Sequence, residues 1–311
     1  MYNSCVQDDK NSEHNVFQGI PIRPNQDKLL SDFIQGLDCS SHTRQALVFD
    51  IRKFAKWFCE ANCEPWDVGR VTFRDVADFR DYLHRDRKQA SSTVNRCLIS
   101  IRKYFKWLAA NNSVANNPVQ GIKELKRQPL APQGLDRPDV RKLLREVELR
   151  SDTRSKAIFS LILYTGARLS DVVQLERTDL SINERSGTVI YRYGKGSKQR
   201  TVPVPLPARK ALLDYLDTRP PVQSEQVFIG ERGPLNNRGI QAVFEKYKAL
   251  TGIENLHPHV LRHTFSHSFL AQGGNLCQLA QILGHESLNT TAIYTKNSIG
   301  QLADATERLT Y

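Results

Sequence analysis

The chain has 311 residues, of which 40% are hydrophobic and 25% charged, with a formal net charge of +11. At roughly 150 residues per domain this length predicts about two domains, and the composition is typical of folded rather than disordered protein. The excess of 44 Lys and Arg over 33 Asp and Glu favours a polyanionic partner, such as DNA, RNA or an anionic membrane surface.

The sequence argues against a membrane span and against a secreted, disulfide-stabilised fold. The longest prominent uncharged stretch, residues 157–167, has 11 residues, whereas a helix needs about 20 to cross a bilayer. The N-terminal residues are polar and acidic, with no apolar segment typical of a secretory signal. The six cysteines form no CxxC pair and are interpreted as free thiols. We therefore expect a cytoplasmic protein with no membrane partner.

The positive charge is shared between two long segments. Residues 28–127 carry a net charge of +7 and residues 128–311 carry +6, whereas the first 27 residues carry −2. A partner that contacts both segments is the simplest interpretation of this distribution, and charged surface that faces only solvent is the alternative.

The first basic segment has the apolar periodicity of helices. After a polar extension over residues 1–27, a helical domain is expected over residues 28–125. Ser40 or Ser41 can cap the second helix and Thr72 the third. The predicted helices are 28–36, 41–61, 72–84 and 91–111. Apolar residues at near-helical spacing in the second are Ala46, Phe49, Phe54, Trp57 and Phe58.

The fourth predicted helix has one apolar and one basic face. Its apolar residues step by three, four and three positions, which indicates a buried stripe formed by Leu98, Ile101, Phe105 and Leu108. The other face carries Arg96, Arg102, Lys103 and Lys106. These side chains are candidates for DNA contact, with a solvated surface as the alternative.

A linker is expected over residues 126–138, where three prolines and a glycine interrupt the helical pattern. Its basic residues, among them Lys126 and Arg127, are candidates for contact with a phosphate backbone.

The remaining residues, 139–311, predict a mixed domain. Residues 188–193 and 200–204 have the β-branched and aromatic content of strands, and the Gly-Lys-Gly turn between them makes a hairpin. Helices are expected at 139–149, 154–164, 170–175, 207–216, 237–251, 259–271, 276–283 and 289–295, followed by a tail helix at 299–308.

Six residues of this domain have side chains suited to phosphodiester chemistry. Two arginines can bind both non-bridging oxygens and stay charged at any working pH. A tyrosine hydroxyl can be a covalent nucleophile, a lysine can protonate a leaving oxygen, and histidines can transfer protons near neutral pH. The candidates are Arg168, Lys195, His259, Arg262, His285 and Tyr294.

Each candidate taken singly also has a structural explanation. Arg168 can form an ion pair with Asp171, Lys195 can lie in a solvated turn, and His285 follows a glycine that can end a helix. His263 and His267 are four residues apart and resemble half of a metal site, but no third ligand is evident. We therefore expect neither a metal nor another cofactor.

The local strings around these six residues resemble the signature of the tyrosine site-specific recombinases, the phage integrase family. TGARLSD resembles the first arginine motif, GKGSKQRTVPV the lysine hairpin, and HPHVLRHTF with LGHESLNTTAIYT the second motif. The spacing of nine residues between His285 and Tyr294 is also that of the family. The resemblance is strong over residues 137–295 and weaker over residues 28–125.

The resemblance implies a mainly α-helical fold with a small antiparallel β-hairpin, in which a helical core-binding domain precedes the catalytic domain. It implies that Tyr294 attacks the scissile phosphate to form a 3′-phosphotyrosyl bond. Arg168 and Arg262 would bind the phosphate, Lys195 would protonate the leaving 5′ oxygen, and His259 would assist proton transfer. His285 would bond the phosphate, and Asp171 would orient the site.

The resemblance also implies partners. Two domains would enclose double-stranded DNA, and a homotetramer would join two recombination sites through a Holliday junction, with accessory proteins or a heterologous recombinase as further partners. The resemblance implies a bacterial, nucleoid-associated enzyme for integration, excision or resolution of a mobile element or replicon. A type IB topoisomerase-like nicking-closing enzyme, a catalytically silent DNA-binding relative and an RNA-binding protein are the alternatives.

Overall fold

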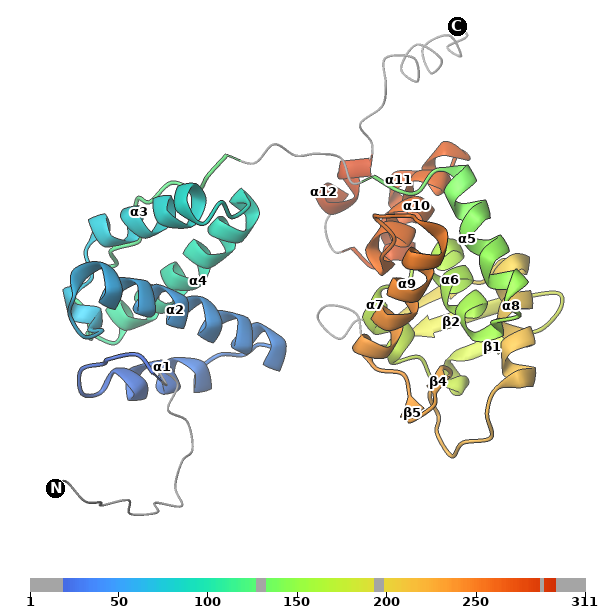
Figure 1. Cartoon of the computed structure of the whole chain (residues 1–311), viewed down its shortest axis with the longest axis horizontal. Helices are drawn as coiled ribbons and strands as arrows, with labels where there is room; N and C mark the ends of the chain where they lie inside the picture. Colours follow the sequence, from blue (N-terminus) through green and yellow to red (C-terminus); the bar gives the residue numbers. More distant parts are fainter. Residues whose placement is uncertain (1–18, 127–132, 193–198, 286–287, 295–311) are drawn as a thin grey trace, which may run out of the picture. The chain divides into compact units, whose positions relative to one another are not determined.

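The chain forms two compact units, residues 1–129 and 130–311, which are described separately below (Figure 1). The structure is a computed structural model that describes residues 19–126, 133–192, 199–285 and 288–294. It is mainly helical with a small antiparallel sheet, so the predicted fold class is confirmed. No helix within these ranges has the length and apolar character that a bilayer crossing requires.

The first unit is built from helices around one apolar core. The stripe predicted on the fourth helix is buried, with Leu98, Ile101, Phe105 and Leu108 at most 1% exposed. Trp66 packs edge-on against Phe54 and Phe58 in the same core. The helices are α1 (Gln26–Gln35), α2 (Ser41–Asn62), α3 (Phe73–Asp81) and α4 (Ser91–Ala110), with short turns η1 (Val68–Arg70) and η2 (Tyr82–Asp86).

The predicted caps are present, but one predicted apolar position faces solvent. Ser40 accepts a hydrogen bond from the Thr43 N–H, and Thr72 forms a capping box with Asp75. Phe49 is 64% exposed. A step of five residues turns a helix by about 500°, so Phe49 lies about 140° away from the direction of the buried Phe54.

A buried carboxylate ties α2 to α4. Asp50 is fully buried, pairs with the Arg96 guanidinium at 2.5 Å and accepts a hydrogen bond from Ser100 at 2.7 Å. Arg102 likewise bonds the Ile122 carbonyl at 3.0 Å. Two of the four basic residues of α4 that were proposed for DNA contact therefore have partners within this unit, whereas Lys103 and Lys106 are exposed.

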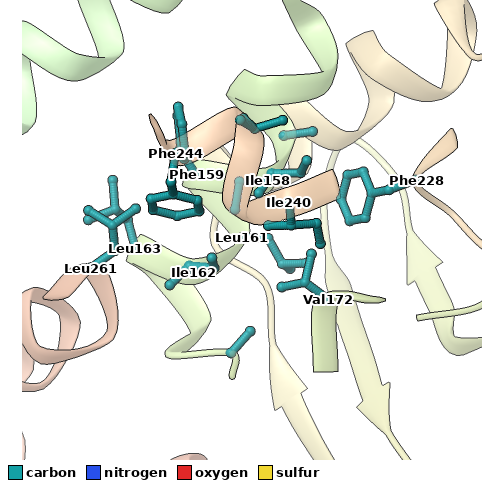
Figure 2. Packing of buried hydrophobic residues seen from close by; sticks show 14 of the residues in the cluster. Ile158, Phe159, Leu161, Ile162, Leu163, Val172, Phe228, Ile240, Phe244 and Leu261 are labelled. Carbon is teal, nitrogen blue, oxygen red and sulfur yellow. The ribbon is translucent and has the colours of Figure 1, made fainter. Parts of the chain in front are cut away.

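The second unit is organised around α6 (Thr153–Thr165), which contacts α5, α8 and α10. From Ala157 to Leu163 its residues are buried on every side, because this part of the helix carries no charge and is largely apolar all round rather than on one stripe. Figure 2 shows its side chains meeting those of α7, α9 and α10; Phe159, for example, lies edge-on against Phe244 at 4.9 Å between ring centroids. The uncharged stretch of residues 157–167 thus lies at the centre of the apolar core of this unit.

The antiparallel sheet has one more strand than the predicted hairpin. Strand β2 (Gly187–Tyr191) pairs with β3 (Arg200–Pro203), and Val189 lies opposite Val202. A third strand, β1 (Leu180–Ile182), pairs with the other edge of β2. Its three residues are too few for an alternating pattern to appear in the sequence, so periodicity missed it. A two-stranded pair, β4 (Ile229–Gly230) and β5 (Gly233–Pro234), was missed for the same reason.

The helix α5 begins two residues earlier than predicted. Asp136 caps it, and Pro138 lies in the first turn, where the missing N–H of proline needs no partner. The tail helix expected at 299–308 lies outside the described residues. The remaining elements are α5 (Arg137–Leu149), α7 (Leu169–Val173), η3 (Arg177–Asp179), α8 (Leu206–Thr218), α9 (Asn237–Thr251), α10 (Pro258–Ala271), α11 (Leu276–Leu283), α12 (Leu288–Thr291) and η4 (Ala292–Tyr294).

Replacement of Arg96 by Met is expected to destabilise the first unit. The change would leave the carboxylate of Asp50 buried with Ser100 as its remaining partner, at a cost of about 3 kcal/mol in the free energy of unfolding. Urea unfolding followed by circular dichroism measures this quantity. Lys103→Met, an exposed change on the same helix, is the control and should shift stability by less than about 0.5 kcal/mol. Equal effects of the two changes would contradict this account of Asp50.

Candidate active site

Arg168 lies at a sharp corner between α6 and α7. Gly166 ends α6 with a φ of 64°, in the left-handed region that favours glycine. A Cβ at this position would lie 2.6 Å from Phe265 Cδ1, so close packing also requires the glycine. The backbone N–H of Arg168 then donates to Asp171 Oδ2 at 2.7 Å. The Arg168 side chain therefore leaves the apolar core around α6 and reaches the carbonyl of Gly284.

Arg262 lies on the side of α10 that faces the same corner. The residue is 5% exposed, and its Nη1 donates to the carbonyl of Gly166. His259, three residues before Arg262, lies on this face of the helix, because residues three apart point in similar directions. The Arg168 and Arg262 motifs, 94 positions apart in the sequence, are thus joined through the glycine of the corner.

Three arginines donate to three successive carbonyls at the C-terminal end of α11. Arg200 Nε donates to Ile282 at 3.0 Å, Arg262 Nη2 to Leu283 at 3.0 Å, and Arg168 Nη2 to Gly284 at 3.2 Å. The last carbonyls of a helix have no partner within the helix and carry partial negative charge, so they suit cationic donors. The helix end that precedes His285 is therefore held from three directions.

Arg200 is the member of this group that the sequence interpretation did not single out. Its side chain is 8% exposed, its Nη2 pairs with Asp171 Oδ2, and its guanidinium lies 4.6 Å above the Tyr191 ring. The expected ion pair of Asp171 with the Arg168 side chain is replaced by this one. One signal was present in the sequence: Arg200 alternates with Val202 and Val204, which are buried, so it occupies an inward position of its strand.

The arginine group retains buried donors that no described residue satisfies. Nη1 of Arg168 and Nη1 of Arg200 are both buried and lack a hydrogen-bond partner among the described residues. Burial and the positive charge of Arg200 lower the pKa of Arg168. Burial, followed by the positive charges of Arg168 and Arg200, lowers the pKa of Arg262. Buried donors and mutual repulsion of like charges are the properties of a site that binds an anion.

His285 is neutral in this arrangement. Its Nε2 lies 3.0 Å from Arg262 Nη2, and since a guanidinium can only donate, Nε2 is the acceptor. The proton is then on Nδ1, which donates to Thr291 Oγ1 at 2.8 Å. Burial, followed by the charges of Arg262, Arg168 and Arg200, lowers the pKa of His285 to about 4. Gly284, with a φ of 63°, ends α11 as expected and turns the chain into His285.

Tyr294 is buried between α10 and α11, where its hydroxyl meets a histidine. The residue is 8% exposed, and its oxygen lies 2.7 Å from His263 Nδ1. His267 lies edge-on to the same ring at 5.3 Å between centroids. The histidine pair that resembled half of a metal site thus surrounds a tyrosine. Burial raises the pKa of Tyr294, so the hydroxyl stays protonated at neutral pH.

The structure brings four of the six candidate residues to neighbouring positions of the second unit: Arg168, Arg262, His285 and Tyr294. His259 lies one turn before Arg262 on α10, and burial, His257 and Arg262 lower its pKa. Lys195 and Arg127 lie outside the described residues. Lys126 is described and exposed. Among the described residues there is no group of three His, Cys, Asp or Glu side chains that could hold a metal ion.

Comparison with known proteins identifies two family models in the chain. The model of the phage integrase family matches residues 133–300, which contain the six candidate residues together with Asp171 and Arg200. The model of the phage integrase N-terminal SAM-like domain matches residues 30–112 of the first unit.

Individual relatives agree with these matches. The tyrosine recombinase XerC of Thermodesulfovibrio yellowstonii is 31% identical over 281 residues, which cover 86% of this chain and 90% of the relative. The XerC of Syntrophus aciditrophicus is 28% identical and covers 91% of this chain and 97% of its own length. The fold matches that of the XerH site-specific recombinase in its post-cleavage complex with difH substrate, at a TM-score of 0.72 and 20% identity over 90% of this chain and 84% of that one.

A double-mutant cycle tests the contact between His263 and Tyr294. His263→Ala and Tyr294→Phe each remove the hydrogen bond, so the double variant should lose less stability than the sum of the two. We expect a coupling of about 0.5–1.5 kcal/mol in the free energy of unfolding, measured by urea denaturation. Strict additivity would show that the hydroxyl has another partner.

Acid should destabilise the second unit before its carboxylates are protonated. Burial and neighbouring positive groups lower the pKa of His263, like that of His285, from 6.5 to about 4. Between these values the unfolded chain binds more protons, so stability falls as the pH drops from about 6.5 towards 4. His263→Gln should reduce the loss between pH 7 and pH 5 by about 1 kcal/mol, less than the whole shift would give because the ring is only partly buried, measured by urea denaturation at both pH values. An unchanged loss in the variant would contradict the burial of a neutral His263.

Proposed function

Because this chain belongs to the phage integrase family and is a tyrosine recombinase, an enzyme of site-specific DNA recombination, we propose that Tyr294 is the nucleophile with which it cuts DNA. The hydroxyl oxygen would attack the scissile phosphorus, form a 3′-phosphotyrosyl bond and release a 5′-hydroxyl. The phosphotyrosyl bond conserves the energy of the cleaved bond. Attack by the 5′-hydroxyl of another strand then reverses the step without ATP or a metal ion.

Arg168 and Arg262 are proposed to bind the scissile phosphate. The strongest support is the turn after α11, where both guanidiniums approach one point and Arg168 Nη1 is buried without a partner among the described residues. A phosphate oxygen would accept from such a donor with a charge-assisted hydrogen bond. The same cations would stabilise the negative charge that accumulates as the tyrosine oxygen adds to phosphorus.

His285 would form a hydrogen bond to the phosphate once its imidazole is protonated. In the structure its Nε2 accepts a hydrogen bond from Arg262. An anion bound beside the arginines favours the protonated imidazole and raises its pKa, so that Nε2–H could then donate to a phosphate oxygen. His259, one turn earlier on α10, is proposed to assist proton transfer, and Asp171 to orient Arg168 through the bond to its backbone N–H.

Lys195 is proposed as the general acid for the leaving 5′ oxygen, on the basis of its place in the GKGSKQR string. The proposal rests on sequence alone, because the residue lies outside the described ranges.

The substrate is proposed to be a pair of double-stranded DNA recombination sites held by a tetramer of this chain. The curated relatives are named tyrosine recombinases, and XerH is solved on its difH substrate. The net charge of +11 supports a polyanionic partner, with affinity that falls steeply as salt rises. Lys103, Lys106 and Lys126 are exposed and remain proposed DNA contacts. With this function, the protein is proposed to act on the bacterial chromosome in the cytoplasm.

Covalent trapping on DNA tests the proposed nucleophile. Nicked duplexes made from DNA around the protein's own gene, incubated in EDTA, should give a protein–DNA band on a denaturing gel. Tyr294→Phe should bind the same DNA and form no such band, since it lacks the attacking oxygen. An adduct in the Tyr294→Phe variant would identify another nucleophile, and a strict need for divalent metal would contradict the mechanism.

A further inference from the structure

Arg200 is a buried arginine that the proposed chemistry does not use. It begins β3, in register with Tyr191 of β2, and its side chain is 8% exposed. Burial of a guanidinium is costly unless its charge is paired and most of its N–H groups are hydrogen-bonded. The identity of its partners therefore indicates what it does for the site.

Those partners lie on α7, on α11 and on β2, the strand beside β3. Arg200 Nη2 pairs with Asp171 on α7, and Nε donates to the Ile282 carbonyl at the end of α11 at 3.0 Å. The Tyr191 ring lies beneath the guanidinium and links it to α6, because the Tyr191 hydroxyl lies 2.7 Å from Thr165 Oγ1 at the end of that helix. Arg200 thus reaches both sides of the corner that presents Arg168.

Packing around Gly284 leaves little room for rearrangement. A Cβ on Gly284 would lie 3.0 Å from Arg200 Cδ, so the side chain lies directly against this turn. Arg168 Nη2 donates to the carbonyl of the same glycine, and His285 follows it in the chain. Movement of Arg200 would therefore displace the turn to which Arg168 is bonded.

The carboxylate of Asp171 is the decisive partner. It is 5% exposed, and its Oδ2 accepts from the Arg168 backbone N–H and from the Arg200 side chain. Without Arg200, a buried carboxylate with unsatisfied charge would lie within three residues of the Arg168 guanidinium. The attraction between them would draw Arg168 into an ion pair and away from the Gly284 carbonyl.

We propose that Arg200 is a positioning residue that pairs with the carboxylate of Asp171, so that the Arg168 guanidinium stays free to bind the scissile phosphate. This inference rests on the proposed function, because it takes Arg168 as the phosphate ligand. In this account Arg200 contributes little to DNA affinity, which many contacts share. Its loss slows the formation of the covalent adduct, which depends on the placement of Arg168.

The first test measures adduct formation and DNA affinity in Arg200 variants. Arg200→Met should slow the adduct about 10²-fold, the effect of a small misplacement of a catalytic group, while the Kd for DNA changes by less than about threefold. Arg200→Lys can pair with Asp171 but lacks the forked guanidinium that also reaches Ile282. Its rate of adduct formation should lie between those of Arg200→Met and the wild type. Arg219→Met is the matched control. Arg219 also donates to backbone carbonyls, those of Val227 and Gln226, in a loop away from the site, and its loss should leave the adduct rate unchanged.

The second test separates positioning from a general loss of structure. Combining Arg200→Met with Asp171→Asn removes the carboxylate that would capture Arg168, so the double variant should form adduct about tenfold faster than Arg200→Met alone. A purely structural role predicts the opposite, since each change removes a further buried contact. A double variant as slow as Arg200→Met or slower, or an Arg200→Met variant with the wild-type rate, would overturn the proposal.

The wild-type reaction distinguishes this proposal from the proposed function. If the wild type forms the Tyr294 adduct and Arg200→Met forms it at the same rate, the role of Arg200 is refuted and the recombinase mechanism stays intact. Absence of a Tyr294 adduct in the wild type, on DNA that it binds, would refute the nucleophile, and the role of Arg200 with it.

Discussion

The second unit depends on three guanidinium groups that meet at one helix end. Burial of like charges opposes folding, and this cost is offset by three carbonyls at the end of α11 and by the carboxylate of Asp171. The balance leaves buried N–H donors on Arg168 and Arg200 without partners among the described residues. The same buried arginines therefore shape the site and supply its chemistry. Their excess of fixed positive charge, held away from water, stabilises an anion that binds beside them.

The same charge sets the protonation of the neighbouring groups. Burial and the arginines lower the pKa of His285 to about 4, so its ring accepts a hydrogen bond, and burial keeps the Tyr294 hydroxyl protonated. Both groups are thus in their neutral forms before DNA binds. A phosphate placed among the arginines adds negative charge and favours protonated His285. Substrate binding and proton movement are coupled through a single electrostatic field.

Two glycines allow this concentration of side chains. Gly166 and Gly284 adopt left-handed backbone conformations, and each lies so near a neighbouring side chain that a Cβ would meet it at 3.0 Å or less. One glycine turns the chain into Arg168 and the other into His285. The close approach of α10 and β3 to these turns lets Arg262 and Arg200 reach backbone carbonyls directly.

The sequence by itself determined the main helices of the described residues, the caps at Ser40 and Thr72, and the two strands of the hairpin, because periodicity and capping depend on residues a few positions apart. Its strings also indicated Arg168, Arg262, His285 and Tyr294 as candidates. Tertiary structure alone decided that Asp171 pairs with Arg200, that His263 meets Tyr294, and that Arg168 reaches the carbonyl of Gly284. These contacts join residues 29 and 31 positions apart in the two side-chain pairs, and 116 positions apart where Arg168 reaches Gly284. No local pattern encodes such distances, because the packing of whole elements sets them.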